Sequence, residues 1–368
     1  MARYELLVGS DAFMQAARAD MSAARRRLLI QAMTFEADAA GRAVGDAILA
    51  SPAADRRVLV DSYTRHVISD ALVWSPKLLL DRAFRDEVRA TGAMFREMAA
   101  NRVGVRVTNP TGPLFLGFAA RSHKKLLVTD DVAYVGGMNF SDHNFEWRDL
   151  MLRIEDAAVA DRLAGDFDAT FAGRPEAWTA DFGDLSIHSL DGRNNRTAFA
   201  GLMETMAAAR ERICVVSPYL TFPFVEVLAR ARARGVEVQL ITPMANNKRT
   251  ARDYLVAAAL DAGFDVRLTP EMEHLKGMLI DDEALILGSS NFDLVSYHAQ
   301  EELVAVVSDP GVIADFRRLV IEPSLAEATV AEPGLIPPSD ARRAHKALKV
   351  LEGIVKATRR ARRGVVPW

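Results

Sequence analysis

The chain carries the same pattern of residues twice, and an internal repeat constrains the possible folds more than any other feature of a sequence. The first copy, residues 122–140, reads His-x-Lys-x4-Asp, then an apolar run, then Gly-Gly-x-Asn-Phe. The second copy, residues 273–292, reads the same with Gly-Ser in place of Gly-Gly. The histidines are 151 residues apart and the asparagines 152, so the copies differ by one residue at the turn. The repeat predicts two related folding units.

The similarity extends outward from both copies in the same order. Short apolar runs lie at 27–31, 57–61, 105–108 and 150–154 around the first copy, and at 212–216, 236–240, 266–269 and 303–307 around the second. Such runs are typical of strands buried on both faces. Helix-like stretches alternate with them at 12–26, 40–49, 84–100, 196–210, 224–234 and 249–262. The alternation predicts an α/β fold of two similar lobes, each a mostly parallel central sheet flanked by helices, packed face to face.

The repeated segments and the glycine-containing stretch between them suggest where the lobes begin and end. We expect a first lobe over residues 1–172 and a second over 196–325. Between them, residues 173–195 contain several glycines and little periodicity, which predicts a linker. Residues 326–368 form a basic amphipathic C-terminal tail.

The net charge of −3 conceals a strong asymmetry. Residues 341–368 contain nine basic residues and one acidic residue, a net charge of +8, which leaves −11 on residues 1–340. In this tail Ala344, Leu348, Leu351 and Val355 would form one stripe of a helix. Such a helix can lie on an anionic membrane surface or pack on the body of the protein, and both possibilities stay open. The acidic body argues against a nucleic-acid partner, because binding a phosphate backbone requires a basic face.

Composition excludes several classes of protein. The single cysteine, Cys214, excludes an intramolecular disulfide framework and a cysteine-cluster metal site. No run approaches 18 apolar residues, so we expect no transmembrane helix, and the first residues lack a secretory pattern. The motifs of P-loop, zinc-protease and serine-hydrolase sites are missing from the sequence. These observations favour a cytoplasmic protein.

The repeated histidines and lysines suggest phosphoryl chemistry. Side chains two residues apart share one face of a strand, so His123 and Lys125 point the same way, as do His274 and Lys276. A neutral imidazole can attack phosphorus and form a covalent phospho-histidine. A second, protonated imidazole can donate its proton to the leaving oxygen. Because the lysines supply the positive charge, this set needs no metal, and we expect no metal and no cofactor.

Two asparagines and two carboxylates complete the candidate set. Asn139 and Asn291 can bind the non-bridging oxygens of a phosphodiester and stabilise its transition state. Asp149 and Glu302 follow these asparagines by ten and eleven residues, at the start of the next strand. A carboxylate there could lie beside the histidine, fix its tautomer and raise its basicity.

Four other motif residues have a more structural interpretation. Asp130 and Asp281 have the opposite strand parity to the histidines and begin Asp-Asp turns, so we expect them to support the fold rather than touch the histidines. Gly137 stands where the second copy has Ser289, so the first copy lacks one hydroxyl ligand.

The two motifs resemble the HKD signature of the phospholipase D superfamily, and more closely its cardiolipin-synthase-like branch. The resemblance rests on residues 121–127, 136–140 and 147–149 for the first motif, and on 288–293 with Ser296 and Glu302 for the second. It implies two similar lobes with one active site at their interface, and a metal-free two-step exchange of phosphodiesters. It also implies that His123 is the nucleophile and His274 the acid, although the opposite assignment is nearly as plausible.

The same resemblance implies a substrate class. The leading hypothesis is a phosphatidyltransferase that moves a phosphatidyl group from a phospholipid, such as phosphatidylglycerol, to an alcohol acceptor. It would be peripheral on the inner face of the cell membrane, bound to anionic lipid through residues 341–368. One alternative is a phospholipase D-type hydrolase, since water can replace the alcohol, and a less favoured one is a nuclease. A non-catalytic binding module is disfavoured, because both His-Lys pairs and both asparagines are intact.

Overall fold

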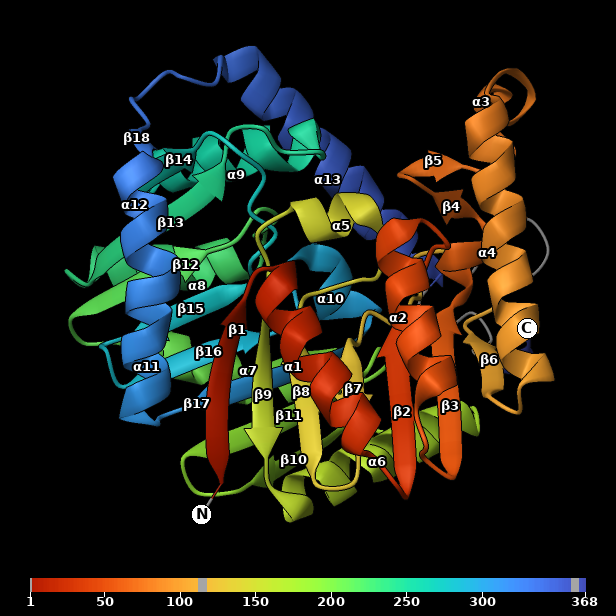
Figure 1. Ribbon diagram of the computed structural model, residues 1–368. Coiled ribbons are helices and arrows are strands. Elements are labelled where there is room, and N and C mark those ends of the chain that lie inside the picture. Colours follow the sequence, from red (N-terminus) through yellow and green to blue (C-terminus); the bar gives the residue numbers. More distant parts are fainter. Residues whose placement is uncertain (1, 112–117, 359–363) are drawn as a thin grey trace. The chain divides into compact units, whose positions relative to one another are not determined.

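The computed structural model describes residues 2–111, 118–358 and 364–368. The chain divides into two compact units, shown in Figure 1. Unit 1 consists of Met1–Glu146, Leu150–Glu176 and Ala361–Trp368, and unit 2 of Trp147–Asp149 and Ala177–Arg360. Each unit is built on one large sheet. The predicted α/β class and the two-lobe organisation are therefore confirmed.

The sheet of unit 1 has the strand order β1-β9-β8-β7-β2-β3-β6-β19. Its strands are β1 (Arg3–Val8), β2 (Arg27–Ala32), β3 (Asp55–Asp61), β6 (Gly104–Thr108), β7 (Leu126–Val128), β8 (Val132–Gly136), β9 (Leu150–Glu155) and β19 (Val365–Pro367). The strands β7 and β8 form a tight antiparallel hairpin in which Leu126 pairs with Val135. This hairpin carries the first copy of the repeat.

Helices cover both faces of this sheet. They are α1 (Ser10–Ala23), α2 (Ala39–Ala50), α3 (Pro76–Leu80), α4 (Arg82–Ala100), α5 (Asp142–Glu146) and α6 (Ala157–Phe171). Phe13 of α1, Val44 of α2 and Phe95 of α4 share one core cluster with the sheet. Figure 1 shows α1 in front of the sheet and α6 behind it. Aspartates cap two of these helices: Asp38 accepts from the Gly41 N–H at the start of α2, and Asp156 accepts from the Ala158 and Val159 N–H groups at the start of α6.

The sheet of unit 2 repeats this arrangement, in the order β10-β11-β17-β16-β15-β12-β13-β14-β18. Its strands are β10 (Trp178–Asp181), β11 (Leu185–Asp191), β12 (Arg212–Val216), β13 (Glu237–Pro243), β14 (Asp265–Thr269), β15 (Gly277–Ile280), β16 (Ala284–Gly288), β17 (Glu301–Val307) and β18 (Thr329–Val330). Its helices are α7 (Asn195–Ala207), α8 (Phe224–Ala233), α9 (Arg249–Asp261), α10 (Leu294–His298), α11 (Pro310–Phe316), α12 (Glu322–Glu327) and α13 (Pro338–Thr358). The second copy lies on the β15–β16 hairpin.

The sheets are mixed, and the prediction that they are mostly parallel is wrong. Among the described strands, the parallel pairings in unit 1 are β2–β3 and β3–β6, and those in unit 2 are β12–β13 and β13–β14. Helices connect these parallel strands, as a crossover requires. The repeat motifs instead form hairpins joined by tight turns, and a hairpin is necessarily antiparallel.

The stretch predicted to be a linker is instead part of a sheet. Within residues 173–195, β10 and β11 form an antiparallel pair, and β11 pairs with β17 over seven residues. Alternation at Leu185, Ile187 and Ser189, whose side chains are buried, carries this signal. The glycines that suggested a linker lie at the turns, for example Gly183 with φ +85°.

In the described residues the C-terminal tail, 326–368, contains the short strand β18, helix α13 and strand β19. Helix α13 packs against α9 and α10 of unit 2, and its Ala344, Leu348 and Val355 are buried. Leu351, the fourth member of the predicted stripe, is 38% exposed. Strand β19 adds to the edge of the unit 1 sheet. The tail arginines Arg359, Arg360, Arg362 and Arg363 lie outside the described residues.

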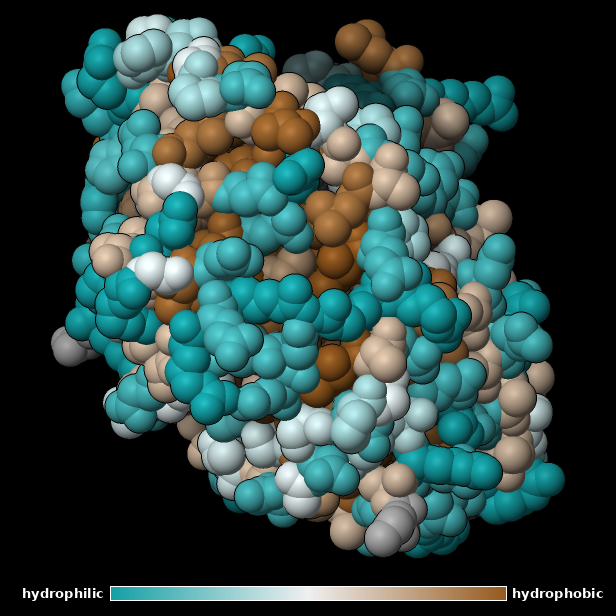
Figure 2. Space-filling model, turned by 90° about the vertical axis from the view of Figure 1, so that its left-hand side faces the viewer, coloured by the Kyte–Doolittle hydropathy of each residue, from teal (hydrophilic) through white to brown (hydrophobic). Residues whose placement is uncertain are grey.

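The connection between β3 and β6 in unit 1 is longer than the one between β13 and β14 in unit 2. It contains a short hairpin of β4 (Val67–Ile68) and β5 (Ala71–Leu72), followed by α3 and by α4, which packs in the core. None of the helices in the described residues is both long and apolar enough to cross a membrane. Figure 2 shows a largely hydrophilic surface in which hydrophobic residues form separate areas. Exposed hydrophobic residues by themselves therefore do not mark a binding face.

Candidate active site

The first His-Lys pair lies directly before a strand rather than within it. His123 and Lys125 are extended residues that precede β7, and both are buried. Lys125 Nζ donates to the His123 carbonyl oxygen at 2.9 Å. This contact holds the lysine beside the backbone of its own histidine.

The second His-Lys pair has the same placement and shows a carboxylate partner. His274 Nδ1 lies 2.7 Å from Asp149 Oδ2, and the two side chains are only 8% and 2% exposed. Lys276 Nζ lies 2.9 Å from the same nitrogen and donates to the His274 carbonyl oxygen. Because an ionised carboxylate can only accept, the imidazole donates its Nδ1 hydrogen to Asp149, which leaves Nε2 as the nitrogen that can take up or release a proton. The pairing joins the carboxylate of the first copy to the histidine of the second.

Backbone pairing explains why Asp149 reaches this histidine. Residues 147–149 belong to unit 2, and Arg148 forms an isolated parallel bridge with Glu273. The His274 N–H donates to the Arg148 carbonyl oxygen at 2.8 Å. The Arg148 guanidinium donates to Glu273 Oε1 at 2.8 Å and to the Ser324 hydroxyl at 2.9 Å. These contacts fix the segment that carries Asp149 alongside the segment that carries His274.

Two aromatic rings contact His274, and the sequence did not single them out as site residues. The Trp147 ring lies 5.3 Å from the imidazole, centroid to centroid, and the Tyr219 ring lies 5.8 Å from it. The Tyr219 hydroxyl donates to the Asn247 side chain. Trp147 is two residues before Asp149, so its place in the first motif was the signal that could have found it. These rings restrict the rotation of the imidazole by packing.

The two motif asparagines differ in their surroundings. Asn139 Oδ1 accepts from the Thr34 N–H at 3.2 Å, and its amide nitrogen lies 3.5 Å from Asn144 Oδ1. Asn291 Oδ1 is buried and has no hydrogen-bond partner among the described residues. The first asparagine is thus engaged in the fold, whereas part of the second amide remains uncommitted there.

The carboxylate of the second copy is held by two hydroxyl groups. Glu302 Oε2 accepts from Ser289, and Oε1 accepts from Ser296 at 2.7 Å. The equivalent of Ser289 in the first copy is Gly137, which provides no hydroxyl. Burial raises the pKa of the neighbouring Asp293 carboxyl, which caps α10, to about 6. The departure between Gly137 and Ser289 therefore changes how each motif carboxylate is supported.

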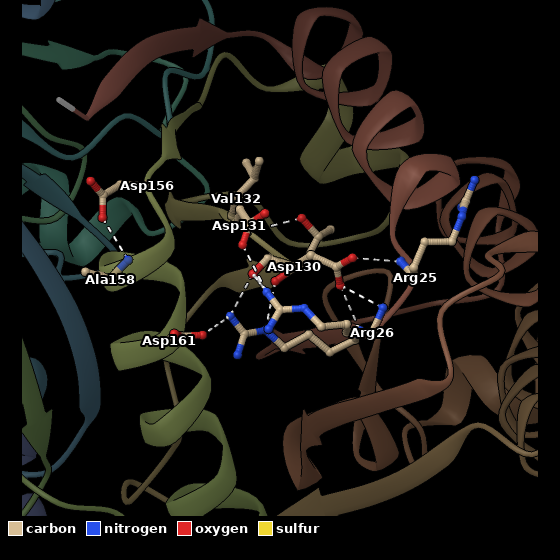
Figure 3. Close-up of polar contacts among 10 residues, drawn as sticks. Arg25, Arg26, Asp130, Asp131, Val132, Asp156, Ala158 and Asp161 are labelled. Carbon is tan, nitrogen blue, oxygen red and sulfur yellow. Dashed lines mark hydrogen bonds and ion pairs between the residues drawn. The ribbon is translucent and has the colours of Figure 1, made fainter.

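The aspartates that end the two H-x-K-x4-D motifs organise turns. Asp130 accepts from the backbone N–H groups of Arg25, Arg26 and Arg27 at 2.9–3.0 Å, and Figure 3 shows its contacts with the first two. Asp281 accepts in the same way from residues 210–212. Burial raises the pKa of each carboxyl, but these backbone hydrogen bonds outweigh it and lower both pKa values. The structure places neither aspartate at a histidine.

Burial strongly affects the charge of the second motif lysine. Lys276 is completely buried, and desolvation lowers its pKa to about 8, against the opposing effects of Asp149, Glu302 and Asp293. Its charge is therefore sensitive to pH near neutrality. A lysine with this property can bind an anionic oxygen at pH 7 and lose that ability a little above pH 8.

Two buried ion pairs support the first motif, and neither was predicted from the sequence. Lys124, between the motif His and Lys, contacts Asp166 of α6 at 2.7 Å, and both side chains are fully buried. Arg121 contacts Asp61 at 2.8 Å, and Asp61 also accepts from the Ser122 N–H. They anchor the motif to α6 on one side and to the end of β3 on the other.

One group of carboxylates in the described residues could hold a cation. Oxygens of Glu36, Asp38 and Glu87 lie within 4.8 Å of one another. Burial raises the pKa of the Glu36 carboxyl to about 8. Ser69 donates to Glu36 and to Glu87, and Gly41 donates to Asp38. The fold itself therefore accounts for these carboxylates.

Comparison with known proteins places the repeat in a family. The chain matches the family model described as cardiolipin synthase, PLD-like domain, over residues 18–171 and 202–321. The minor cardiolipin synthase ClsB of Bacillus subtilis is 28% identical over 255 residues, which are 63% of this chain and 63% of that protein. Cardiolipin synthase A of Pseudomonas aeruginosa is 27% identical over 366 residues, 92% of this chain and 69% of that protein.

Solved structures share the fold. Phosphatidylserine synthase of Haemophilus influenzae superposes with a TM-score of 0.71 and 15% identity, over 96% of this chain and 94% of that chain. Polyphosphate kinase of Porphyromonas gingivalis superposes with a TM-score of 0.56 and 15% identity, over 95% of this chain and 56% of that chain. The fold alone therefore does not select one reaction. The family model covers most of the sequence, including both motifs, so the chain belongs to the phospholipase D superfamily, in the family of the cardiolipin synthase PLD-like domain.

Proposed function

We propose that the protein is a phosphatidyltransferase of the cardiolipin synthase type, in which His123 and His274 act on the same phosphodiester. The observation that carries the proposal is the buried Asp149–His274 pair beside Lys276. It provides an oriented imidazole and an adjacent cation, which phosphoryl transfer requires. The family relationship and the second, intact His-Lys pair at His123 support it.

In the first step, the nucleophilic histidine attacks phosphorus with the lone pair of a ring nitrogen. A nitrogen–phosphorus bond forms and the bond from phosphorus to the leaving alkoxide oxygen breaks. The other histidine, protonated, donates its proton to that oxygen, so the leaving group departs as an alcohol. We assign the attack to His123 and the proton donation to His274, whose imidazolium Asp149 would stabilise.

In the second step, the acceptor alcohol attacks the phosphorus of the phospho-histidine. The now neutral acid histidine takes the proton of the alcohol, the new oxygen–phosphorus bond forms, and the nitrogen–phosphorus bond breaks. Lys125, Lys276, Asn139 and Asn291 would bind the non-bridging oxygens and stabilise the charge that develops on them. Water in place of the alcohol would give the hydrolase.

The proposed donor is a phospholipid such as phosphatidylglycerol, because relatives of the chain are named for synthesis of phospholipids. The proposed acceptor is an alcohol, which includes a second phosphatidylglycerol or glycerol. We propose further that the protein acts at an anionic membrane surface on the cytoplasmic side, with the basic tail of residues 341–368 contributing charge.

The test is incubation with phosphatidylglycerol vesicles in chelator, with and without glycerol or ethanol. Cardiolipin or a transphosphatidylated product is expected, and phosphatidic acid alone would indicate a hydrolase instead. A donor labelled in its phosphate should leave acid-labile label on the wild-type protein after alkaline quenching, and none on His123→Ala. Near-normal turnover by His123→Ala or His274→Ala would refute the two-histidine mechanism. Cleavage of DNA without lipid turnover would refute both lipid functions.

A further inference from the structure

The outward side of α13 carries an apolar stripe that packing leaves uncovered. The inward side buries Ala344, Leu348 and Val355 against unit 2. Val350 is 65% exposed and Ile354 is 53% exposed, and Leu351 between them is 38% exposed. The spacing of 350, 351 and 354 places these three side chains on one face of a helix. This outer stripe shares only Leu351 with the stripe that the sequence predicted.

Basic residues border the outer stripe. Arg342 and Lys346 are exposed and lie about two turns and one turn before Val350, and neither forms an ion pair within the part of the chain that the structure describes. Arg343 is 80% exposed at its side chain. Arg343 lies 3.4 Å from Asp340 at the start of the helix, whereas Lys349 and Lys356 share Glu352 and remain about half exposed. Arg342 and Lys346 therefore add positive charge beside the stripe that no acidic residue of the helix pairs with in the described residues.

Contacts with unit 2 fix which side of α13 faces outward. Glu352 accepts from both lysines and lies 3.1 Å from His298 Nε2 of α10. Lys349 Nζ lies 3.8 Å from the centre of the Phe222 ring. Burial raises the pKa of the Glu352 carboxyl, but its hydrogen bonds with Lys356, His298 and Lys349 outweigh burial and lower the pKa to about 2, so it stays charged at neutral pH. The helix is thus held along α9, as Figure 1 shows, and its outer stripe cannot rotate inward without breaking these contacts.

We propose that the outward face of α13, formed by Val350, Leu351 and Ile354 with Arg342 and Lys346, binds the surface of an anionic lipid bilayer. The apolar side chains insert at the boundary between headgroups and acyl chains, and the basic side chains contact the lipid phosphates. Charge complementarity selects this occupant, because an apolar stripe bordered by unpaired cations matches an anionic bilayer. The inference rests on the proposed function, since a phospholipid substrate must be reached in a bilayer.

Vesicle flotation with the full chain tests the face. Wild type should bind vesicles of phosphatidylglycerol and phosphatidylcholine and should bind pure phosphatidylcholine weakly. One basic residue near an anionic surface strengthens binding roughly fivefold, so Arg342→Gln with Lys346→Gln should weaken binding about 25-fold at low salt and less at high salt. Val350→Ser with Ile354→Ser should weaken binding at least about tenfold.

Matched variants elsewhere in unit 2 make the comparison specific. Arg193→Gln with Arg230→Gln removes two exposed basic residues, and Val330→Ser with Leu335→Ser removes two exposed apolar residues. Both should bind vesicles as wild type does. Thermal unfolding of every variant shows whether the fold is retained.

Several outcomes would overturn the proposal. They are absence of wild-type binding to anionic vesicles, equal binding by the α13 variants and wild type, and equal losses in the matched variants. A wild-type dimer that the α13 changes convert to a monomer would make the face a contact between copies of the chain. Turnover of dispersed short-chain phosphatidylglycerol by the unaltered protein tests the proposed function separately, because that substrate requires no bilayer.

Discussion

Replacement of Asp149 by Asn tests whether the carboxylate orients the imidazole of His274. The contact is 2.7 Å long, and its two side chains are 2% and 8% exposed, so solvent provides little screening. A hydrogen bond to a charged group contributes roughly 1.5–3 kcal/mol. Each 1.36 kcal/mol of transition-state stabilisation corresponds to a factor of ten in rate. If Asp149→Asn loses the full contribution of this hydrogen bond in the transition state, kcat should fall about 10- to 150-fold.

Two measurements together separate this effect from simple unfolding. Phosphatidyl transfer gives kcat, and nitrogen NMR of the imidazole reports its tautomer, which should be Nδ1–H in the wild type and a mixture in Asp149→Asn. Glu146→Gln is the matched control, because it removes an exposed carboxylate three residues earlier and should change neither quantity. A kcat for Asp149→Asn within about twofold of wild type, with an unchanged tautomer, would show that the carboxylate does not orient His274.

Three further predictions concern charge. Because the pKa of Lys276 is lowered to about 8, activity should decline above pH 8, and a flat activity profile to pH 10 would contradict this. The free energy of unfolding should rise between pH 8 and about 10.4, because the unfolded chain binds more protons than the folded chain over that range. Lys124→Met should destabilise the fold by about 3–5 kcal/mol in chemical denaturation, because it leaves the Asp166 charge buried and unpaired. The double variant Lys124→Met with Asp166→Leu should recover most of that loss. Equal stability of the single and double variants would show that the unpaired charge is not the cause. Asp130→Ala and Asp281→Ala should each lower the free energy of unfolding by about 1–2 kcal/mol at pH 7. Because the folded state lowers the pKa of both carboxyls, this loss should vanish as the pH falls below the folded pKa. A loss that does not depend on pH would exclude the ionised carboxylates as its source.

Much of the fold could be predicted because the signals were local. The predicted helices at 84–100 and 249–262 correspond to α4 and α9, and the predicted strand at 212–216 is β12. Amphipathic spacing and short apolar runs fix such elements whatever packs on them. The edge strands β10 and β19 were missed, since a short half-exposed strand has little pattern of its own and is stabilised by the neighbour with which it pairs.

The candidate site was predicted in its residues but not in its pairing. The repeat selected Asp149 as a carboxylate near a motif histidine, yet sequence spacing gave no means to tell that it contacts His274 of the other copy. That choice depends on the bridge between Arg148 and Glu273, which joins segments 125 residues apart. Tyr219 could not be found in the same way, because a ring contact between distant segments leaves no pattern in the sequence, whereas Trp147 could have been found from its place in the first motif.

The sequence by itself determined that this chain has two related α/β units and which side chains are candidates for a site, because a repeat and its residue types are visible along the chain. Only the tertiary structure decided which contacts those residues form. It assigned Asp149 to His274, buried Lys276 until its pKa fell to about 8, and turned the Val350–Ile354 stripe of α13 outward. Each of these three features depends on the removal of water from a side chain or on the contact between segments that are distant in the sequence. Desolvation and such contacts exist only in the folded chain.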